Sequence, residues 1–570
     1  MTVARTSSEA RDLPQEGNLS LGVLLLSGVQ HVAVIAPSGL VFPLLVLRAA
    51  ESSVALQEAV ITASLIALGL GSLLLCARGH YFGSGYLAPS VFTAAYLPPS
   101  LAAAKSGGMG LVFGMTIFAG LCEILFSFAL RRLRPFFPVE ISGLAVVMIG
   151  LILGLLGFRL TLGMAGRTFG LGEIEIGTAA LGLVTLAVIV TFNVWGKGPL
   201  KAFSVLFGLT LVYLLASLLG ALEPEFSSEQ APASLMALPS LPLLALDFDW
   251  SLVVPFLIGA LACALRAVGD ITTCQRITNP KWVRPDMGSI ERAIRADGFS
   301  TIIAGGLGTV GLNTFSGSIG LSQATGIMQR SVGLSIAGLF VLLAFLPPLH
   351  NLFITLPAPL FGAILMFSAA FILANGLNII VARMLDTRRI LTIGIALILG
   401  ISHDVYPHLF DSLPLWLRSF AGSSLVVALV TALLLNALFR IGTKQTAKLE
   451  ATLDQDLLGK IFLFCRENGA IWGARRDVMD RVVAALTEAG ELAMGNSREK
   501  GKAALEIRYD EFRILADFSY ETAARAGSEE FSEEGMMTEE LELRLMRHFA
   551  DQVTLAEAPG RKSMRLVFHT

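Results

Sequence analysis

The feature that most constrains this chain is a succession of apolar segments, each about 20 residues long, between about residue 19 and residue 441. A hydrocarbon core of roughly 30 Å needs about 20 apolar residues per helix, so these segments are typical of membrane-spanning helices. With 54% hydrophobic and 15% charged residues and a mean hydropathy of +0.70, the composition is that of a multi-pass membrane protein. The net charge of -2 gives no indication of nucleic-acid binding.

The apolar segments form two groups of about seven, separated by a loop at 222–249 that is rich in Pro, Ser and Glu. They lie near 20–47, 52–76, 82–104, 109–130, 137–157, 176–195, 199–221, 250–273, 297–312, 313–329, 332–350, 356–381, 387–406 and 415–440. An odd number of spans per group inverts the second group relative to the first. We therefore predict an all-α polytopic membrane protein of about 14 transmembrane segments, with inverted repeats at about 19–221 and 250–441.

The placement of Lys and Arg indicates the orientation in the membrane, because these residues accumulate in cytoplasmic loops. They gather in alternate loops, whereas the 222–249 loop carries five acidic residues and no Lys or Arg. This pattern predicts an inner-membrane protein with both termini in the cytoplasm. Residues 1–18 are polar and lack the apolar stretch of a signal peptide, so we expect a cytosolic tail there.

Beyond residue 443 the chain is dense in charge and predicts a soluble cytosolic domain. We expect 442–458 to continue the last membrane helix as a linker and 459–570 to fold as a small α/β sandwich. The expected elements are helices at 475–494 and 539–553 and strands at 503–510, 512–519 and 563–570.

Several polar side chains stand inside the apolar segments, where such groups are costly and face a cavity or the interior of the bundle. Gln30 and His31 lie deep in the first segment. His31 either lines a transport site or bonds to a backbone carbonyl of a neighbouring helix. Glu123 in the fourth segment belongs either to a proton path or to a structural hydrogen bond.

The third and tenth segments are broken by glycine, which predicts a short strand leading into a half-helix in each. The N-termini of such half-helices carry partial positive charge and point toward a site at the membrane midplane. Residues 85–87 and 317–319 are expected to face each other across that site. Tyr86 either stacks on a planar substrate ring or packs in the core.

Taken in order along the chain, these features resemble the xanthine/uracil permeases of the nucleobase-ascorbate transporter, or nucleobase:cation symporter, family over about residues 19–441. The residues that match the family's first-, eighth- and tenth-segment motifs are Gln30, His31, Gly269, Asp270, Gly320 and Thr325. The resemblance implies a homodimeric secondary active transporter that moves a purine or pyrimidine nucleobase by alternating access, coupled to a cation such as H+.

Three positions depart from the family's pattern. Arg266 stands where the family has a substrate-binding Glu, and Gly317 and Ser318 stand where it has Gln or Glu followed by Asn. Because Arg only donates hydrogen bonds and is always charged, we expect a substrate with acceptor oxygens or negative charge, such as urate, ionised xanthine or a non-nucleobase anion. The alternative is that Arg266 and Asp270, four residues apart on one helix face, neutralise each other.

The candidate site combines these residues and contains no catalytic or metal-binding group. We predict substrate contacts from Tyr86, Arg266, Gly317, Ser318 and Gln323, and ion coupling or site support from Gln30, His31, Asp270 and Thr325. The five cysteines share no metal-ligand spacing, and no cofactor is expected.

Residues 459–570 resemble the ATP-binding fold of anti-sigma-factor serine kinases, on the stretch ALTEAGELAMGN and the strands that follow it. In that fold an Asn four residues after a Glu holds the metal, but here Leu492 follows Glu488 at that spacing. The Asp-x-Gly of the fold is reduced to Asp517 followed by Phe and Ser. We therefore expect this domain to bind a cytosolic regulatory protein.

Two alternatives to nucleobase transport stay open. Sulfate and bicarbonate carriers resemble this inverted seven-plus-seven plan and also carry a cytosolic C-terminal domain, so Arg266 allows an inorganic or organic anion as substrate. The other alternative is a transporter-derived sensor that relays substrate occupancy to the kinase-like domain.

Overall fold

The computed structural model describes residues 19–569 except for 134–138, 164–175, 219–234, 244, 280–284, 382–384, 386, 415–422, 440–444, 455, 473, 475, 496–500, 511–512, 522–543 and 559. The predicted N-terminal tail at 1–18 lies outside the described residues. The chain divides near residue 438 into two compact units, a membrane unit and a C-terminal unit.

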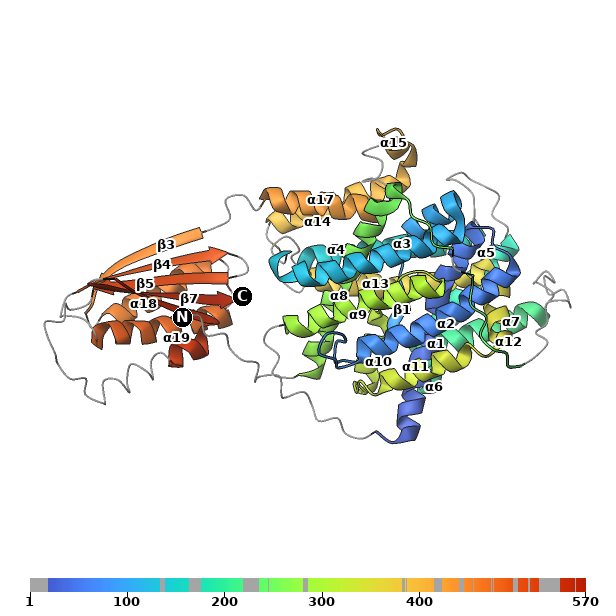
Figure 1. The fold of residues 1–570 in the computed structure, drawn as a ribbon, viewed down its shortest axis with the longest axis horizontal. Coiled ribbons are helices and arrows are strands. Elements are labelled where there is room, and N and C mark those ends of the chain that lie inside the picture. Colours follow the sequence, from blue (N-terminus) through green and yellow to red (C-terminus); the bar gives the residue numbers. More distant parts are fainter. Residues whose placement is uncertain are drawn as a thin grey trace. The chain divides into compact units, whose positions relative to one another are not determined.

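The membrane unit is helical apart from two short strands (Figure 1). Its elements are α1 (Leu21–Ala49), α2 (Val54–Cys76), β1 (Ser90–Phe92), α3 (Leu97–Leu133), α4 (Val139–Thr161), α5 (Ile176–Trp195), α6 (Pro199–Ala202), α7 (Ser204–Leu218), the 3-10 turn Trp250–Leu252, α8 (Val253–Thr278), α9 (Met287–Leu307), β2 (Leu312–Thr314), α10 (Ser316–Thr325), α11 (Val332–Leu343), α12 (Pro347–Thr355), α13 (Ala358–Ile380), α14 (Thr387–Val405), α15 (Pro407–Asp411) and α17 (Ser424–Phe439).

These elements confirm the predicted polytopic helical fold with strands in the third and tenth segments. Among the described residues, 7 helices are long and apolar enough to cross a bilayer, and α7, α11 and α17 are shorter apolar helices. The exact number of 14 spans stays a prediction. Two packing groups are visible: α1, α2, α3, α8, α9 and α11 contact one another, and α4, α5, α7, α13 and α14 form a second set.

The two strands form an antiparallel ribbon in the middle of the first helix set, with Val91 opposite Asn313. Backbone polar groups inside a membrane must find partners within the protein, and a two-stranded ribbon leaves both its edges open. Helix side chains close these edges. Ser72 of α2 accepts from the Ser90 amide at 3.1 Å, and Thr301 of α9 bonds both the amide and the carbonyl of Leu312.

Each strand leads into a half-helix, as the glycine pattern predicts. The helix after β1 begins at Leu97, and α3 is interrupted at Gly108, whose φ of 73° is not helical. The half-helix after β2 is α10, which ends at Gly326 in the left-handed conformation. Because the strands are antiparallel, the two half-helices leave from opposite ends of the ribbon, and the β2–α10 junction at Thr314 lies beside Ser90, the first residue of β1. This junction positions the site described below.

Helices α3 and α9 cross at a close approach of their backbones. A Cβ atom on Gly298 would lie 2.6 Å from the carbonyl oxygen of Gly120 and 2.9 Å from the Cβ of Glu123. Only glycine fits at such a crossing. The approach sets Glu123 beside the residues that flank Gly298 on α9.

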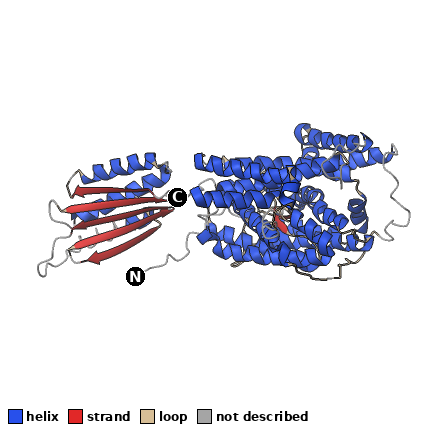
Figure 2. Cartoon of the chain, turned by 90° about the horizontal axis from the view of Figure 1, so that it is seen from above, coloured by secondary structure: helices blue, strands red, loops and turns tan. Residues whose placement is uncertain are grey.

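The C-terminal unit is a two-layer α/β domain. Its elements are β3 (Gln445–Thr452), α18 (Leu457–Ile471), α19 (Arg476–Gly495), β4 (Lys502–Asp510), β5 (Arg513–Glu521), a helix at 544–549, β6 (Gln552–Ala558) and β7 (Arg561–His569). The strands form one antiparallel sheet in the order β3-β4-β5-β7-β6, with helices on one face (Figure 2).

Over the described residues, the helix predicted at 475–494 is observed as α19 and the three predicted strands as β4, β5 and β7, but the linker helix predicted at 442–458 is wrong. Residues 445–452 form β3, in which Leu449 pairs with Leu505. The alternation in QTAKLEAT, with Ala447, Leu449 and Ala451 on the face toward α18, has the period of two that favours a strand. The predicted helix at 539–553 is likewise too long, because β6 begins at Gln552.

Candidate functional site

The polar centre of the membrane unit is Asp270 of α8, which is only 2% exposed. Thr314, the last residue of β2, donates its hydroxyl to Asp270 Oδ2 at 2.7 Å, and Ser316, the first residue of α10, donates to Oδ1 at 2.7 Å. Both carboxylate oxygens thus accept from the strand-to-helix junction. We call Asp270, Arg266, Thr314 and Ser316 the Asp270 centre.

Arg266 lies one turn before Asp270 on α8 and is also 2% exposed. Its Nε is 3.7 Å from Asp270 Oδ2, an ion pair without a hydrogen bond. Within the described part of the chain, Nε and Nη2 have no hydrogen-bond partner. A buried guanidinium with unpaired N–H groups is costly, so these donors are available to a ligand with acceptor oxygens.

Helix α1 reaches the same region through His31, which is 1% exposed. Its Nδ1 lies 3.0 Å from the hydroxyl oxygen of Ser318 on α10. The hydrogen-bond partner of His31 is therefore the Ser318 side chain in the second group of segments. The alternative prediction was a backbone carbonyl of a neighbouring helix. Gln30, the neighbouring residue, is half-buried.

The predicted substrate residues are split between two places. Ser318 lies at the first turn of α10 beside His31, and a Cβ on Gly317 would lie 2.6 Å from the Phe315 ring, which would have to shift. Tyr86 and Gln323, in contrast, line a small open pocket together with Cys274, Thr278 and Ser322. Cys274 follows Asp270 by four residues, about 6 Å along α8, so this pocket adjoins the Asp270 centre one helical turn away.

Thr325 does not point to the Asp270 centre. Its hydroxyl donates to the carbonyls of Leu321 and Ser322, one turn back on its own helix. This is the local bonding that Ser and Thr often make inside helices. A site-support role for Thr325 stays a prediction.

Sequence reasoning missed the two hydroxyls that hold Asp270 and the partners of Glu123. Thr314 and Ser316 flank Phe315 at the end of β2, and a polar residue on each side of a strand-to-helix junction was the available signal. Glu123 accepts a hydrogen bond from the hydroxyl of Tyr96 and faces Asp297 of α9. These contacts join residues 27 and 174 positions apart, which no local pattern reveals.

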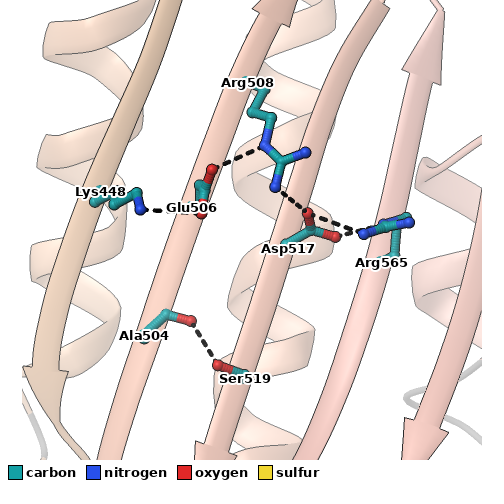
Figure 3. A network of polar contacts seen from close by, with 7 residues as sticks. All are labelled: Lys448, Ala504, Glu506, Arg508, Asp517, Ser519 and Arg565. Carbon is teal, nitrogen blue, oxygen red and sulfur yellow. Dashed lines mark hydrogen bonds and ion pairs between the residues drawn. The ribbon is translucent and has the colours of Figure 1, made fainter.

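In the C-terminal unit, the two acidic residues singled out by the kinase resemblance lie on opposite faces of the sheet. Asp517 is in the middle of β5 on the face without helices, where Arg508 and Arg565 pair with it (Figure 3). Glu488 is on α19, where burial and the nearby Glu491 raise the pKa of its carboxyl. Leu492, at the position where that fold has its metal-binding Asn, packs in the domain core.

The open face of this sheet carries a row of alternating charges. Glu506 of β4 lies between Lys448 of β3 and Arg508, and the hydrogen bond from Arg508 lowers the pKa of its carboxyl (Figure 3). Exposed pairs of this kind contribute little stability. The row is a solvated face of the domain.

Comparison with known proteins agrees with the architecture. The xanthine/uracil permease profile, described as "Permease family", matches residues 22–409. The xanthine permease XanP of Escherichia coli is 27% identical over 77% of this chain and 96% of its own length, and the xanthine permease XanQ of E. coli is 28% identical over 74% and 92%. The nucleobase transporter PlUacP of Paenibacillus larvae is 23% identical over 76% and 98%.

Among solved structures, murine Slc26a9, an anion transporter in the inward-facing state, aligns with a TM-score of 0.50 at 12% identity, over 77% of this chain and 72% of that chain. This likeness concerns the fold alone. A helical membrane unit in which two broken segments surround a buried polar centre defines the class of multi-pass membrane permeases. Within that class, the chain belongs to the xanthine/uracil permease family.

Proposed function

We propose that this protein is a secondary active transporter that carries a purine or pyrimidine nucleobase across the inner membrane by alternating access, coupled to H+. Family membership over residues 22–409 supports the transport class, and the relatives named as xanthine permeases and as a nucleobase transporter support the substrate class. The two helix packing groups suit a mechanism in which one group moves against the other. No enzymatic step is proposed.

The observation that carries the substrate proposal is Arg266, whose buried Nε and Nη2 have no hydrogen-bond partner among the described residues. A neutral base recognised through its ring N–H groups needs acceptors, but a guanidinium offers only donors. An oxygen-rich or anionic base, such as urate or the xanthine monoanion, presents acceptors to Arg266. Ser318, held by His31, adds a hydroxyl on the side of α10.

Counterflow into proteoliposomes tests this proposal. Proteoliposomes that contain the purified full chain are loaded with unlabelled xanthine, urate or uracil. Uptake of the same radiolabelled base is then measured, with sulfate and bicarbonate as competitors. We expect exchange of urate or xanthine that exceeds exchange of uracil. Competition by an inorganic anion and by no base would instead favour the anion-carrier alternative.

A substitution at Arg266 tests which group selects the substrate. In Arg266→Glu the side chain accepts hydrogen bonds, so preference is expected to shift from urate toward uracil and neutral xanthine. Tyr86→Phe is the matched control, because it removes only a hydroxyl and keeps the aromatic ring in the pocket that adjoins the Asp270 centre. An unchanged preference in folded Arg266→Glu protein would show that Arg266 only neutralises Asp270.

The same proposal includes three features of the whole protein. We propose a homodimer, with both termini in the cytoplasm and the C-terminal unit as a docking site for a cytosolic regulatory protein. In a variant truncated before Gln445, which removes the whole domain including β3, transport is expected to persist. A sensor function would instead be supported if truncation abolished a cellular response while uptake stayed intact.

A further inference from the structure

A second polar cluster lies apart from the Asp270 centre, where α3 crosses α9. Glu123 and Asp297 are both 0% exposed, and the Gly120–Gly298 approach holds their helices together. We call Glu123 and Asp297 the carboxyl pair. Two carboxyl groups this deeply buried and side by side cannot both be ionised at low cost.

The hydrogen bonding of the carboxyl pair is incomplete. Tyr96 donates its hydroxyl to Oε1 of Glu123. Within the described residues, Oε2 of Glu123 and both carboxylate oxygens of Asp297 have no hydrogen-bond partner. Carboxylates only accept, so two facing carboxylates cannot bond to each other until one of them gains a proton. A single proton between them satisfies one oxygen on each side.

The thiol of Cys263 on α8 is a weak donor toward Glu123, but among the described residues both oxygens of Asp297 stay without a donor. Helix α8 faces the pair with Cys263, Arg266 and Asp270, and β2 adds Asn313, whose Nδ2 is buried and unpartnered. Arg266 is the cation of this set, but its ion pair is with Asp270. One positive charge therefore faces three buried carboxyl groups.

We propose that Glu123 and Asp297 bind the coupling proton between them, and that Asp270, neutralised by Arg266, does not take part in proton transfer. One proton enters from the aqueous phase and forms a carboxylic acid on one member, which donates to the carboxylate of the other. Release of the proton restores two carboxylates and requires water to reach the pair. It therefore takes place in a conformation in which water enters the α3–α9 crossing. This inference rests on the proposed H+-coupled transport.

Separate measurements of coupling and exchange test the inference in proteoliposomes. In Glu123→Gln the amide N–H₂ donates to Asp297 and takes the place of the proton, which keeps the pair bonded. We expect counterflow of urate or xanthine within about threefold of the wild type. Accumulation driven by an inward proton gradient, and the alkalinisation of the medium that accompanies uptake, are expected to be lost. Asp297→Asn is the second variant, with the same expectation.

The matched control is Glu140→Gln on α4. Glu140 is also buried, at 2% exposed, but Arg389 pairs with it at 3.3 Å. Its removal is expected to leave the ratio of protons to substrate unchanged. Retained proton-driven accumulation in Glu123→Gln would overturn the inference, and so would uptake driven by a sodium gradient alone. Failure of the wild type to exchange any base would refute the proposed function itself.

Infrared difference spectroscopy of the full chain in detergent tests the carboxyl pair without any substrate. The wild type at neutral pH is expected to show the carbonyl band of a buried carboxylic acid, which deuterium shifts. That band is expected to disappear in both Glu123→Gln and Asp297→Asn, because each variant removes the shared proton, and to persist in Glu140→Gln. A band that survives in both pair variants would overturn the inference even if transport cannot be measured.

Discussion

In the Asp270 centre, we expect that removing Arg266 and removing Asp270 lower the stability of the protein by different amounts. Removing one member of a buried ion pair typically costs about 3–5 kcal/mol, because the other charge stays buried without compensation. After Arg266→Gln, Asp270 keeps two hydroxyl donors at 2.7 Å and can take up a proton. After Asp270→Asn, Arg266 cannot lose its charge, and it already has two nitrogens without hydrogen-bond partners.

The Asp270→Asn variant also loses a hydrogen bond. An amide has one acceptor oxygen, so either Thr314 or Ser316 is left with a buried hydroxyl that has no acceptor, at a cost of about 1–3 kcal/mol. We therefore expect Asp270→Asn to lower the free energy of unfolding by about 1–3 kcal/mol more than Arg266→Gln does. The double variant is expected to be more stable than the sum of the two changes predicts, by about 0.5–3 kcal/mol.

Unfolding of the purified full chain in detergent, followed by tryptophan fluorescence during a denaturant titration, measures this cycle. The reasoning is refuted if Arg266→Gln is the more damaging change. It is also refuted if the effects are additive, because additive effects would mean that the 3.7 Å approach of Arg266 to Asp270 carries no interaction.

Three further predictions follow from the geometry. Gly298→Ala should destabilise the α3–α9 crossing by about 1–3 kcal/mol or more in the same denaturant titration. Its control is Gly306→Ala on the same helix, where no atom lies within 4 Å of the added Cβ, and this variant should be neutral or slightly stabilising. Phe518→Ala should cost the C-terminal unit about 3–5 kcal/mol and expose β5 to hydrogen exchange, and equal protection in the variant would contradict this packing role. Tyr86→Ala should weaken base binding several-fold in an equilibrium binding assay while Tyr86→Phe does not, and equal losses in both would argue against stacking.

Sequence patterns predicted the membrane architecture well, because lipid imposes a length and an apolar composition on every span. They also predicted the strand and half-helix in the third and tenth segments, since glycine there permits backbone that a continuous helix excludes. The linker helix failed for a physical reason. Residues 445–452 alternate with a period of two, but the preceding apolar helix and the dense charge suggested a continuation, and pairing with β4 decides the outcome.

The candidate site was harder to predict than the fold because its contacts join distant parts of the chain. Spacing on α8 alone suggested the pairing of Arg266 with Asp270, which the structure shows as a long ion pair. The hydroxyls of Thr314 and Ser316 reach Asp270 only through the ribbon register, 44 and 46 residues further along the chain. Tyr86 instead lines the adjoining pocket, because the loop before β1 places it one turn of α8 beyond Asp270.

The arrangement of charges connects the two proposals. Where a family pattern has a Glu and this chain has Arg266, a buried acceptor is replaced by a buried cation, so the charge of the region rises by two. Asp270, 3.7 Å from Arg266, neutralises that cation, so the empty Asp270 centre carries no net charge. If a base then enters as an anion toward the free guanidinium nitrogens, the loaded Asp270 centre carries a net charge of about -1, and a proton on the carboxyl pair lowers the cost of moving that charge through lipid. Anion binding and proton binding are therefore expected to favour each other, and urate affinity should rise as the pH falls in the wild type but not in Glu123→Gln.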